Sequence, residues 1–164
     1  MKTLIIYYSN EGNTKIVAET IARQLGCYIC QVKDLKKRKG FANKFTSTID
    51  AFRETKTEIY PPKVDLTEFD TIYFGTPTWA NNPSPAITTM IDNCNLIGKD
   101  VVLFATMSSS GGETAIEKME TKVTSRGGRV IERFTLKTKD KDKNELVRTS
   151  EAMVQSLDLK MYSR

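Results

Sequence analysis

The segment Leu4-Ile5-Ile6-Tyr7-Tyr8-Ser9-Asn10-Glu11-Gly12-Asn13-Thr14 decides the fold. It opens with an apolar run typical of a buried strand, and a helical pattern follows from about Lys15. The first N–H groups of such a helix have no intrahelical acceptor, and the helix dipole adds partial positive charge there. Ser9 and Thr14 add hydroxyl donors, and a glycine at position 12 lets the main chain approach a ligand closely. The segment therefore predicts a phosphate site, and an ordinary strand–helix junction capped by Asn13 or Ser9 is the alternative.

Apolar runs and helical patterns alternate along the whole chain of 164 residues. Further runs with strand character lie at residues 28–32, 71–74, 101–105 and 130–136. Apolar side chains at helical spacing mark amphipathic helices within residues 18–25, 41–52, 87–94, 116–123 and 146–157. Runs that are apolar throughout indicate strands buried on both faces, as in a parallel sheet covered by helices. We predict one doubly wound α/β domain spanning residues 1–164, with a five-stranded parallel sheet in the order 2-1-3-4-5 and helices on both faces.

In this strand order, the loops after the first, third and fourth strands meet where the winding reverses. We expect Gly75 to end the third strand and residues 76–85 to form a proline-rich loop that holds the only tryptophan, Trp79. At such a point an indole suits stacking on a flat ring, and a lid over the core is the alternative. Ser84 and Pro85 fit the N-cap and first residue of the next helix.

The loop after the fourth strand, residues 106–112, is rich in serine and glycine. Its N–H and O–H groups suit the polar edge of a bound ring, and a plain turn is the alternative. Because all three loops favour the same kind of ligand, together they are stronger evidence than any one of them alone.

Composition limits what the chain can do. The sequence has no histidine, which removes Ser-His-Asp and Cys-His nucleophilic schemes and argues against a zinc site. We expect its three cysteines to be reduced thiols. The longest apolar runs are far shorter than the roughly 20 residues needed to cross a bilayer, so we expect no membrane insertion and a cytoplasmic location.

The formal net charge is +5, with basic residues gathered in Lys33–Lys39 and Lys137–Lys143. Such runs are usually solvated surface, and docking of an acidic partner protein is the functional alternative. No helix combines a basic stripe with interleaved aromatic residues, so we expect no nucleic-acid binding.

These residues resemble the flavodoxin-like family of FMN proteins, in particular its short-chain members with a G-T-P-x-W motif, here Gly75–Trp79. The family's phosphate loop, S/T-x-T-G-x-T, is matched at Ser9, Gly12, Asn13 and Thr14. The resemblance covers nearly the whole chain and implies non-covalent FMN, which the protein binds, orients and tunes without a catalytic acid or base. The residues that it implies for cofactor binding are Ser9, Asn10, Glu11, Gly12, Asn13, Thr14, Thr76, Pro77, Thr78, Trp79, Ala80, Asn81, Thr106, Met107, Ser108, Ser109, Ser110, Gly111 and Gly112.

Two features depart from the family pattern. Glu11 stands where the family usually has a hydroxyl, and we expect its carboxylate to point away from the phosphate. Trp79 supplies one aromatic face for the ring, whereas the 106–112 loop offers no aromatic residue for the other.

Three functions therefore remain open. The first is electron transfer between redox partner proteins through FMN. The second is an FMN reductase that uses NAD(P)H or a quinone, because an uncovered ring face is what hydride transfer needs. The third is a flavin-free binding or regulatory module on the same fold.

Overall fold

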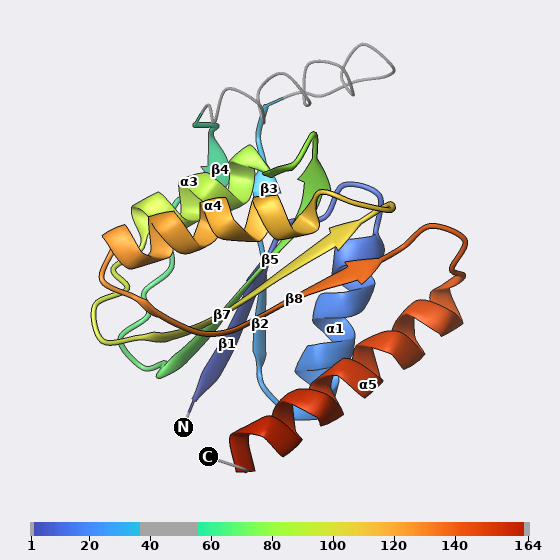
Figure 1. Ribbon diagram of the computed structural model, residues 1–164. Helices are drawn as coiled ribbons and strands as arrows, with labels where there is room; N and C mark the ends of the chain where they lie inside the picture. Colours follow the sequence, from blue (N-terminus) through green and yellow to red (C-terminus); the bar gives the residue numbers. More distant parts are fainter. Residues whose placement is uncertain (1, 37–55, 163–164) are drawn as a thin grey trace.

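The computed structural model describes residues 2–36 and 56–162 and has a central parallel sheet (Figure 1). The predicted strand order 2-1-3-4-5 is confirmed, because the strands lie in the order β2-β1-β5-β7-β8 and all four pairings are parallel. Their bounds are β1 Thr3–Tyr7, β2 Tyr28–Gln31, β5 Thr71–Trp79, β7 Asp100–Met107 and β8 Arg129–Lys137.

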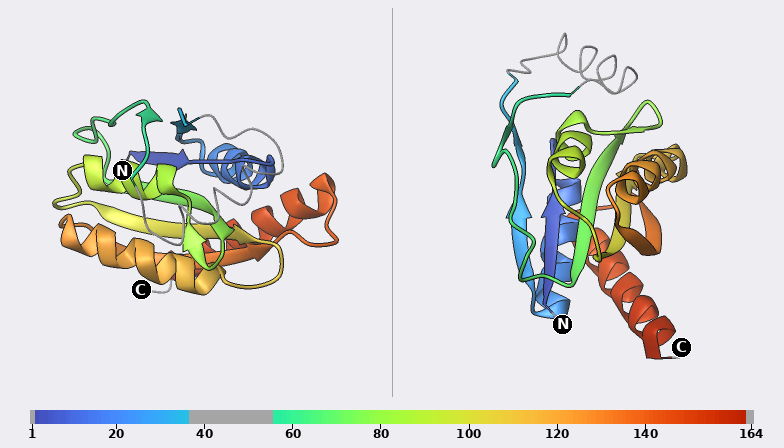
Figure 2. Two further views of the ribbon diagram at one scale, coloured as in Figure 1. Left: turned by 90° about the horizontal axis from the view of Figure 1, so that it is seen from above. Right: turned by 90° about the vertical axis from the view of Figure 1, so that its left-hand side faces the viewer.

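Helices cover both faces of the sheet, as predicted. Helices α1 (Asn13–Leu25) and α5 (Lys143–Tyr162) lie on one face. Helices α3 (Pro85–Asn93) and α4 (Gly112–Ser125) lie on the other, as the two further views make clear (Figure 2). The amphipathic helix predicted from Phe41 to Phe52 lies outside the described residues.

Strand β1 shows why the sheet is buried on both sides. Ile5 and Tyr7 pack against α1 and α5, while Leu4 and Ile6 pack against α3 and α4. At most 4% of each of these side chains is exposed, because successive residues of a strand point to opposite faces and both faces meet a helical layer. The apolar run at the start of the chain therefore anchors both cores.

Strands β5 and β7 approach closely at a glycine. A Cβ atom on Gly75 would lie 2.1 Å from Cζ of Phe104, whose ring stacks on that of Phe134 at a centroid distance of 5.6 Å. Only a residue without a side chain leaves room for this ring, so the glycine serves packing and does not end the strand.

The prediction of a loop over residues 76–85 was wrong. Strand β5 continues to Trp79, turns at Ala80 and Asn81, and returns as the short antiparallel strand β6 (Asn82–Pro83). Both turn residues have positive φ, 48° and 63°, as in the tight two-residue turns that suit the twist of a hairpin. The prolines favoured a loop in the sequence analysis. A strand nevertheless tolerates proline at a position where the sheet needs no N–H donor.

A second short pairing, of β3 (Lys33–Asp34) with β4 (Ile59–Tyr60), is antiparallel and was not predicted. Two residues on each side are too few to give a periodic signal in the sequence.

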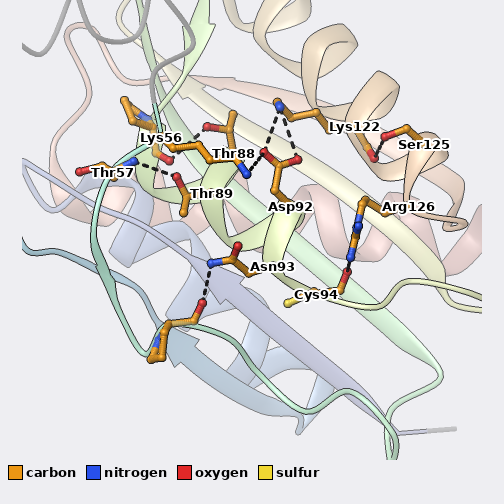
Figure 3. A network of polar contacts seen from close by, with 12 residues as sticks. Lys56, Thr57, Thr88, Thr89, Asp92, Asn93, Cys94, Lys122, Ser125 and Arg126 are labelled. Carbon is orange, nitrogen blue, oxygen red and sulfur yellow. Dashed lines mark hydrogen bonds and ion pairs between the residues drawn. The ribbon is translucent and has the colours of Figure 1, made fainter.

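Polar contacts join α3 to α4 (Figure 3). Lys122 Nζ lies 3.2 Å from Asp92 Oδ2, and the Arg126 guanidinium donates to the carbonyl oxygen of Cys94 over 3.1 and 3.2 Å. These contacts fix the position of α4 against α3, and the N-terminus of α4 follows the carboxyl end of β7.

The three cysteines form no disulfide. Burial raises the pKa of the thiols of Cys27, Cys30 and Cys94 above the ordinary value, so all three are protonated at neutral pH.

Candidate functional site

The three predicted segments meet at one pocket of about 240 Å³. It lies where β1, β5 and β7 end, at the carboxyl edge of the sheet. The residues that line it are Ser9, Asn10, Glu11, Asn13, Thr14, Pro77, Thr78, Trp79, Thr106, Met107, Ser108 and Thr138.

The first segment leaves the start of α1 open. Gly12, with φ of 98°, is the N-cap residue, and no side chain caps the helix. The Ser9 hydroxyl accepts a hydrogen bond from the N–H of Gly12 over 3.1 Å, which closes the turn. The N–H groups of residues 13–15 precede the first intrahelical hydrogen bond, which Ile16 donates to the carbonyl oxygen of Gly12. They can therefore bind an anion in the pocket.

Two threonines join the first segment to the third. The hydroxyls of Thr14 and Thr106 are hydrogen-bonded at 2.8 Å, and both side chains are buried. In such a pair one hydroxyl donates to the other, so the accepting hydroxyl keeps its own hydrogen for another acceptor. Because both residues line the pocket, that acceptor can be a ligand.

The β5–β6 hairpin carries the indole of Trp79 to the pocket. The Trp79 ring meets that of Tyr8 edge to face, with centroids 5.7 Å apart and planes at 87°. The Asn82 side chain donates to the carbonyl oxygen of Ala80 over 2.7 Å and accepts from Nζ of Lys118. The hairpin is therefore held from inside by Asn82 and from α4 by Lys118.

The Thr78 hydroxyl is a buried polar atom without a hydrogen-bond partner within residues 2–36 and 56–162. An unsatisfied buried hydroxyl costs free energy, about 1–3 kcal/mol. Thr78 lines the pocket, so a ligand with polar atoms would remove this cost. This observation favours an FMN-like molecule over a purely apolar one.

Thr76 braces the hairpin and does not line the pocket. Its side chain is completely buried and its hydroxyl accepts from the N–H of Ser84 over 2.8 Å. The Ser84 hydroxyl in turn accepts from the N–H of Ile87, and Pro85 opens α3. The predicted N-cap is confirmed, and it is tied to the base of the hairpin.

Other predicted site residues also lie outside the lining. Gly111, the N-cap residue of α4, has φ of 89°, and a Cβ atom there would lie 2.2 Å from Oδ1 of Asn81. The turn of the hairpin therefore lies directly against the start of α4. The predicted residues that do not line the pocket are Gly12, Thr76, Ala80, Asn81, Ser109, Ser110, Gly111 and Gly112.

Thr138 lines the pocket, and the sequence analysis missed it. It follows β8, and its N–H and hydroxyl donate to the carbonyl oxygen of Met107 over 2.8 and 3.2 Å. The signal was present in the sequence: a fifth parallel strand also ends at this edge.

The lining has no basic side chain, which is unusual for a site that binds an anion. Glu11, which is exposed, is the one acidic residue among the lining residues, and none of them is lysine or arginine. A phosphate here would be held by N–H groups, hydroxyls and the α1 dipole.

A parallel sheet covered by helices on both faces, with a polar pocket at its carboxyl edge, places the chain among the doubly wound α/β domains, whose ligands bind at this edge. Within this class, the flavodoxin family model matches residues 2–146. The chain therefore belongs to the flavodoxin family.

Solved structures agree with this fold. A flavoprotein of Lactobacillus acidophilus in complex with FMN is 25% identical, covers 82% of this chain and 92% of its own, and has a TM-score of 0.71. A candidate flavoprotein of Bacteroides uniformis is 24% identical, with 94% and 97% coverage and a TM-score of 0.80. Oxidised flavodoxin 2 of Bacillus cereus is 19% identical, with 98% and 99% coverage and a TM-score of 0.60.

Comparison with curated proteins gave no match. Within the part of the chain that the structure describes, no helix is long and apolar enough to span a membrane.

Proposed function

We propose that this protein binds FMN non-covalently in the pocket and carries electrons between partner proteins. The observation that carries the proposal is the meeting of an indole, Trp79, with an open helix N-terminus in one pocket. A ligand that fits both needs a flat ring and an anionic end, and FMN has both. Membership of the flavodoxin family and the FMN complex of a relative support this assignment.

Different residues of the chain would bind the phosphate and the ring of FMN. The N–H groups that follow Gly12 and the hydroxyls of Ser9 and Thr14 would hold the phosphate. Trp79, fixed edge to face against Tyr8, would stack on the ring. The bound flavin supplies the redox chemistry, while the protein orients it and limits its contact with water.

An FMN reductase that uses NAD(P)H or a quinone is the second candidate. The observation that favours it is Met107, which lines the pocket on a segment, residues 106–112, that offers no aromatic residue to cover a second face of the ring. Methionine is flexible and leaves more room than a fixed aromatic ring. A hydride donor could then approach the flavin from this side.

Anaerobic reduction of the purified, FMN-loaded protein separates these functions. NADH or NADPH alone should leave the visible flavin bands unchanged, and addition of an NADPH-dependent flavodoxin reductase should bleach them. Bleaching by a nicotinamide alone would favour the reductase. A colourless protein that takes up no added FMN would overturn both and favour the flavin-free binding module.

A further inference from the structure

The carboxyl end of β8 continues into a basic segment at the pocket. We propose that residues 137–143, here called the basic rim, form the docking surface for an acidic face of a redox partner protein. The rim contains four lysines, Lys137, Lys139, Lys141 and Lys143. The proposal rests on the proposed function, because it assigns where that protein exchanges electrons.

Hydrogen bonds join the basic rim to residues that line the pocket. Thr138 lies within it and lines the pocket, and its N–H donates to the carbonyl oxygen of Met107 over 2.8 Å. The N–H of Lys139 donates to the carbonyl oxygen of Ser108 over 3.1 Å. Both acceptors belong to lining residues, so a partner that contacts this segment would stand beside the pocket mouth.

The charged side chains of the rim are exposed, and their net charge is positive. All four lysines are exposed, and none of them forms an ion pair within residues 2–36 and 56–162. Nζ of Lys141 donates to the carbonyl oxygen of Lys137 over 3.0 Å, which leaves its charge unneutralised.

The acidic residues of this segment reduce its charge only in part. Asp142 exchanges hydrogen bonds with Glu145 at the start of α5, each at 2.8 Å, so its carboxylate is committed to the helix N-terminus. Asp140 occupies a turn with φ of 59° and is exposed. The positive excess agrees with the formal net charge of +5 for the whole chain.

This chemistry fits a protein better than a membrane or a nucleic acid. The large exposed apolar side chains of the described residues are Tyr28, Ile29, Leu35, Tyr60 and Ile97. None of them lies in the rim, so the rim offers no apolar side chain for insertion into a lipid surface. Residues 137–143 contain no aromatic side chain on which a nucleic-acid base could stack. Alternating charges instead suit a small, transient interface, in which charge complementarity speeds encounter.

Electron transfer to two haem proteins of opposite charge tests the proposal. The FMN-loaded protein is reduced anaerobically and mixed with ferric cytochrome b5, which is acidic, or with ferric mitochondrial cytochrome c, which is basic. Each haem iron takes one electron from the reduced flavin and passes from the ferric to the ferrous state, so two haems are reduced per two-electron-reduced flavin. The rates are measured by stopped-flow absorbance at several ionic strengths.

We expect Lys139→Glu to slow transfer to cytochrome b5 about threefold or more at low salt and to speed transfer to cytochrome c. High salt should reduce these differences. The matched control is Lys63→Glu, which makes the same change of charge at an exposed position beside Asn95 and Lys99, where β7 begins. That edge of the sheet is opposite the pocket, so the control should leave both rates near those of the unchanged protein.

Equal effects of Lys139→Glu and Lys63→Glu would overturn the docking surface and leave the proposed function standing. So would binding to anionic phospholipid vesicles or duplex DNA that Lys139→Glu abolishes while the cytochrome b5 rate stays unchanged. A protein that holds no FMN would overturn the proposed function and the redox docking role together. The visible spectrum, recorded before each mixing, tells these cases apart.

Discussion

Trp79 has two roles, one in packing against the core and one in the pocket. It sits at the end of β5, packs against the core beside Tyr8 and lines the pocket. We expect Trp79→Ala to weaken FMN binding about tenfold, because stacking contributes roughly 1 kcal/mol beyond the apolar area buried. Fluorescence of free FMN measures the change, and Trp79→Tyr should keep most of the affinity. Equal affinity of the Ala variant and the unchanged protein would refute the stacking role.

Glu11 bears on the phosphate end of the pocket. It is exposed and lines the pocket. Although we expect its carboxylate to point away from the phosphate, the charge would still repel the dianion at low salt, where screening is weak. Glu11→Thr should therefore tighten FMN binding about threefold at low salt. Riboflavin, which lacks the phosphate, is the control ligand and should bind both proteins equally. An equal gain for both ligands would show that the effect does not act through the phosphate.

The stability of the folded chain depends on pH through the buried side chain of Tyr7. Burial raises the pKa of Tyr7 to about 12, and the charges of Glu19 and then Cys30 contribute in the same direction. The unfolded chain ionises this phenol near its ordinary pKa of 10.0, while the folded chain keeps its proton. The contribution of Tyr7 to stability is thus complete below pH 10 and is lost as the pH rises toward 12.

The expected loss is about 3 kcal/mol over this range, since each unit of pKa shift corresponds to about 1.4 kcal/mol. Urea denaturation at a series of pH values measures it, with Tyr7→Phe as the comparison. The variant should lose less stability than the unchanged protein between pH 10 and 12. Parallel curves for the two proteins would contradict the shifted pKa.

At the scale of elements, the β5–β6 hairpin decides where the indole lies. Lys118 on α4 holds Asn82, and Asn82 holds the turn at Ala80. We expect Lys118→Met to weaken FMN binding several-fold, because a hydrogen bond to a charged donor contributes about 1.5–3 kcal/mol and its loss frees the hairpin. Lys118→Arg should restore much of the affinity.

Lys122 is the matched control on the same helix. It pairs with Asp92 on α3, away from the hairpin, so Lys122→Met should lower the urea midpoint without changing FMN affinity. Apoprotein fluorescence gives a second measurement, because Trp79 is the only indole. Its emission should change in Lys118→Met and stay the same in Lys122→Met. The reverse pattern would show that α4 does not position the hairpin.

Around the same hairpin, one feature was predicted correctly from the sequence and another was not. Ser84 and Pro85 were placed correctly because a helix N-cap is a local signal that a few residues specify. The run from Thr76 to Trp79 was misread because its prolines outweighed a pairing that depends on distant partners. Thr138 was missed for a similar reason: only the register of β8 against β7 brings it to Met107.

At the scale of the whole molecule, the strand order followed from simple constraints. Apolar runs such as Ile72–Phe74 and Val101–Ala105 have to be buried on both faces, and right-handed crossovers leave few ways to arrange them. The phosphate segment then selected the edge where ligands bind. What the pattern could not provide was the depth of each side chain, so buried braces such as Thr76 were counted with the lining.

FMN binding in the pocket, between the start of α1 and Trp79, is the central claim, because both redox functions proposed for this protein require it. Titration of the apoprotein with FMN, followed by the fluorescence of its single tryptophan, tests that claim directly. We predict quenching that saturates at one FMN per chain, with weaker binding of riboflavin. Unchanged Trp79 emission at excess FMN, with no flavin retained after gel filtration, would contradict it.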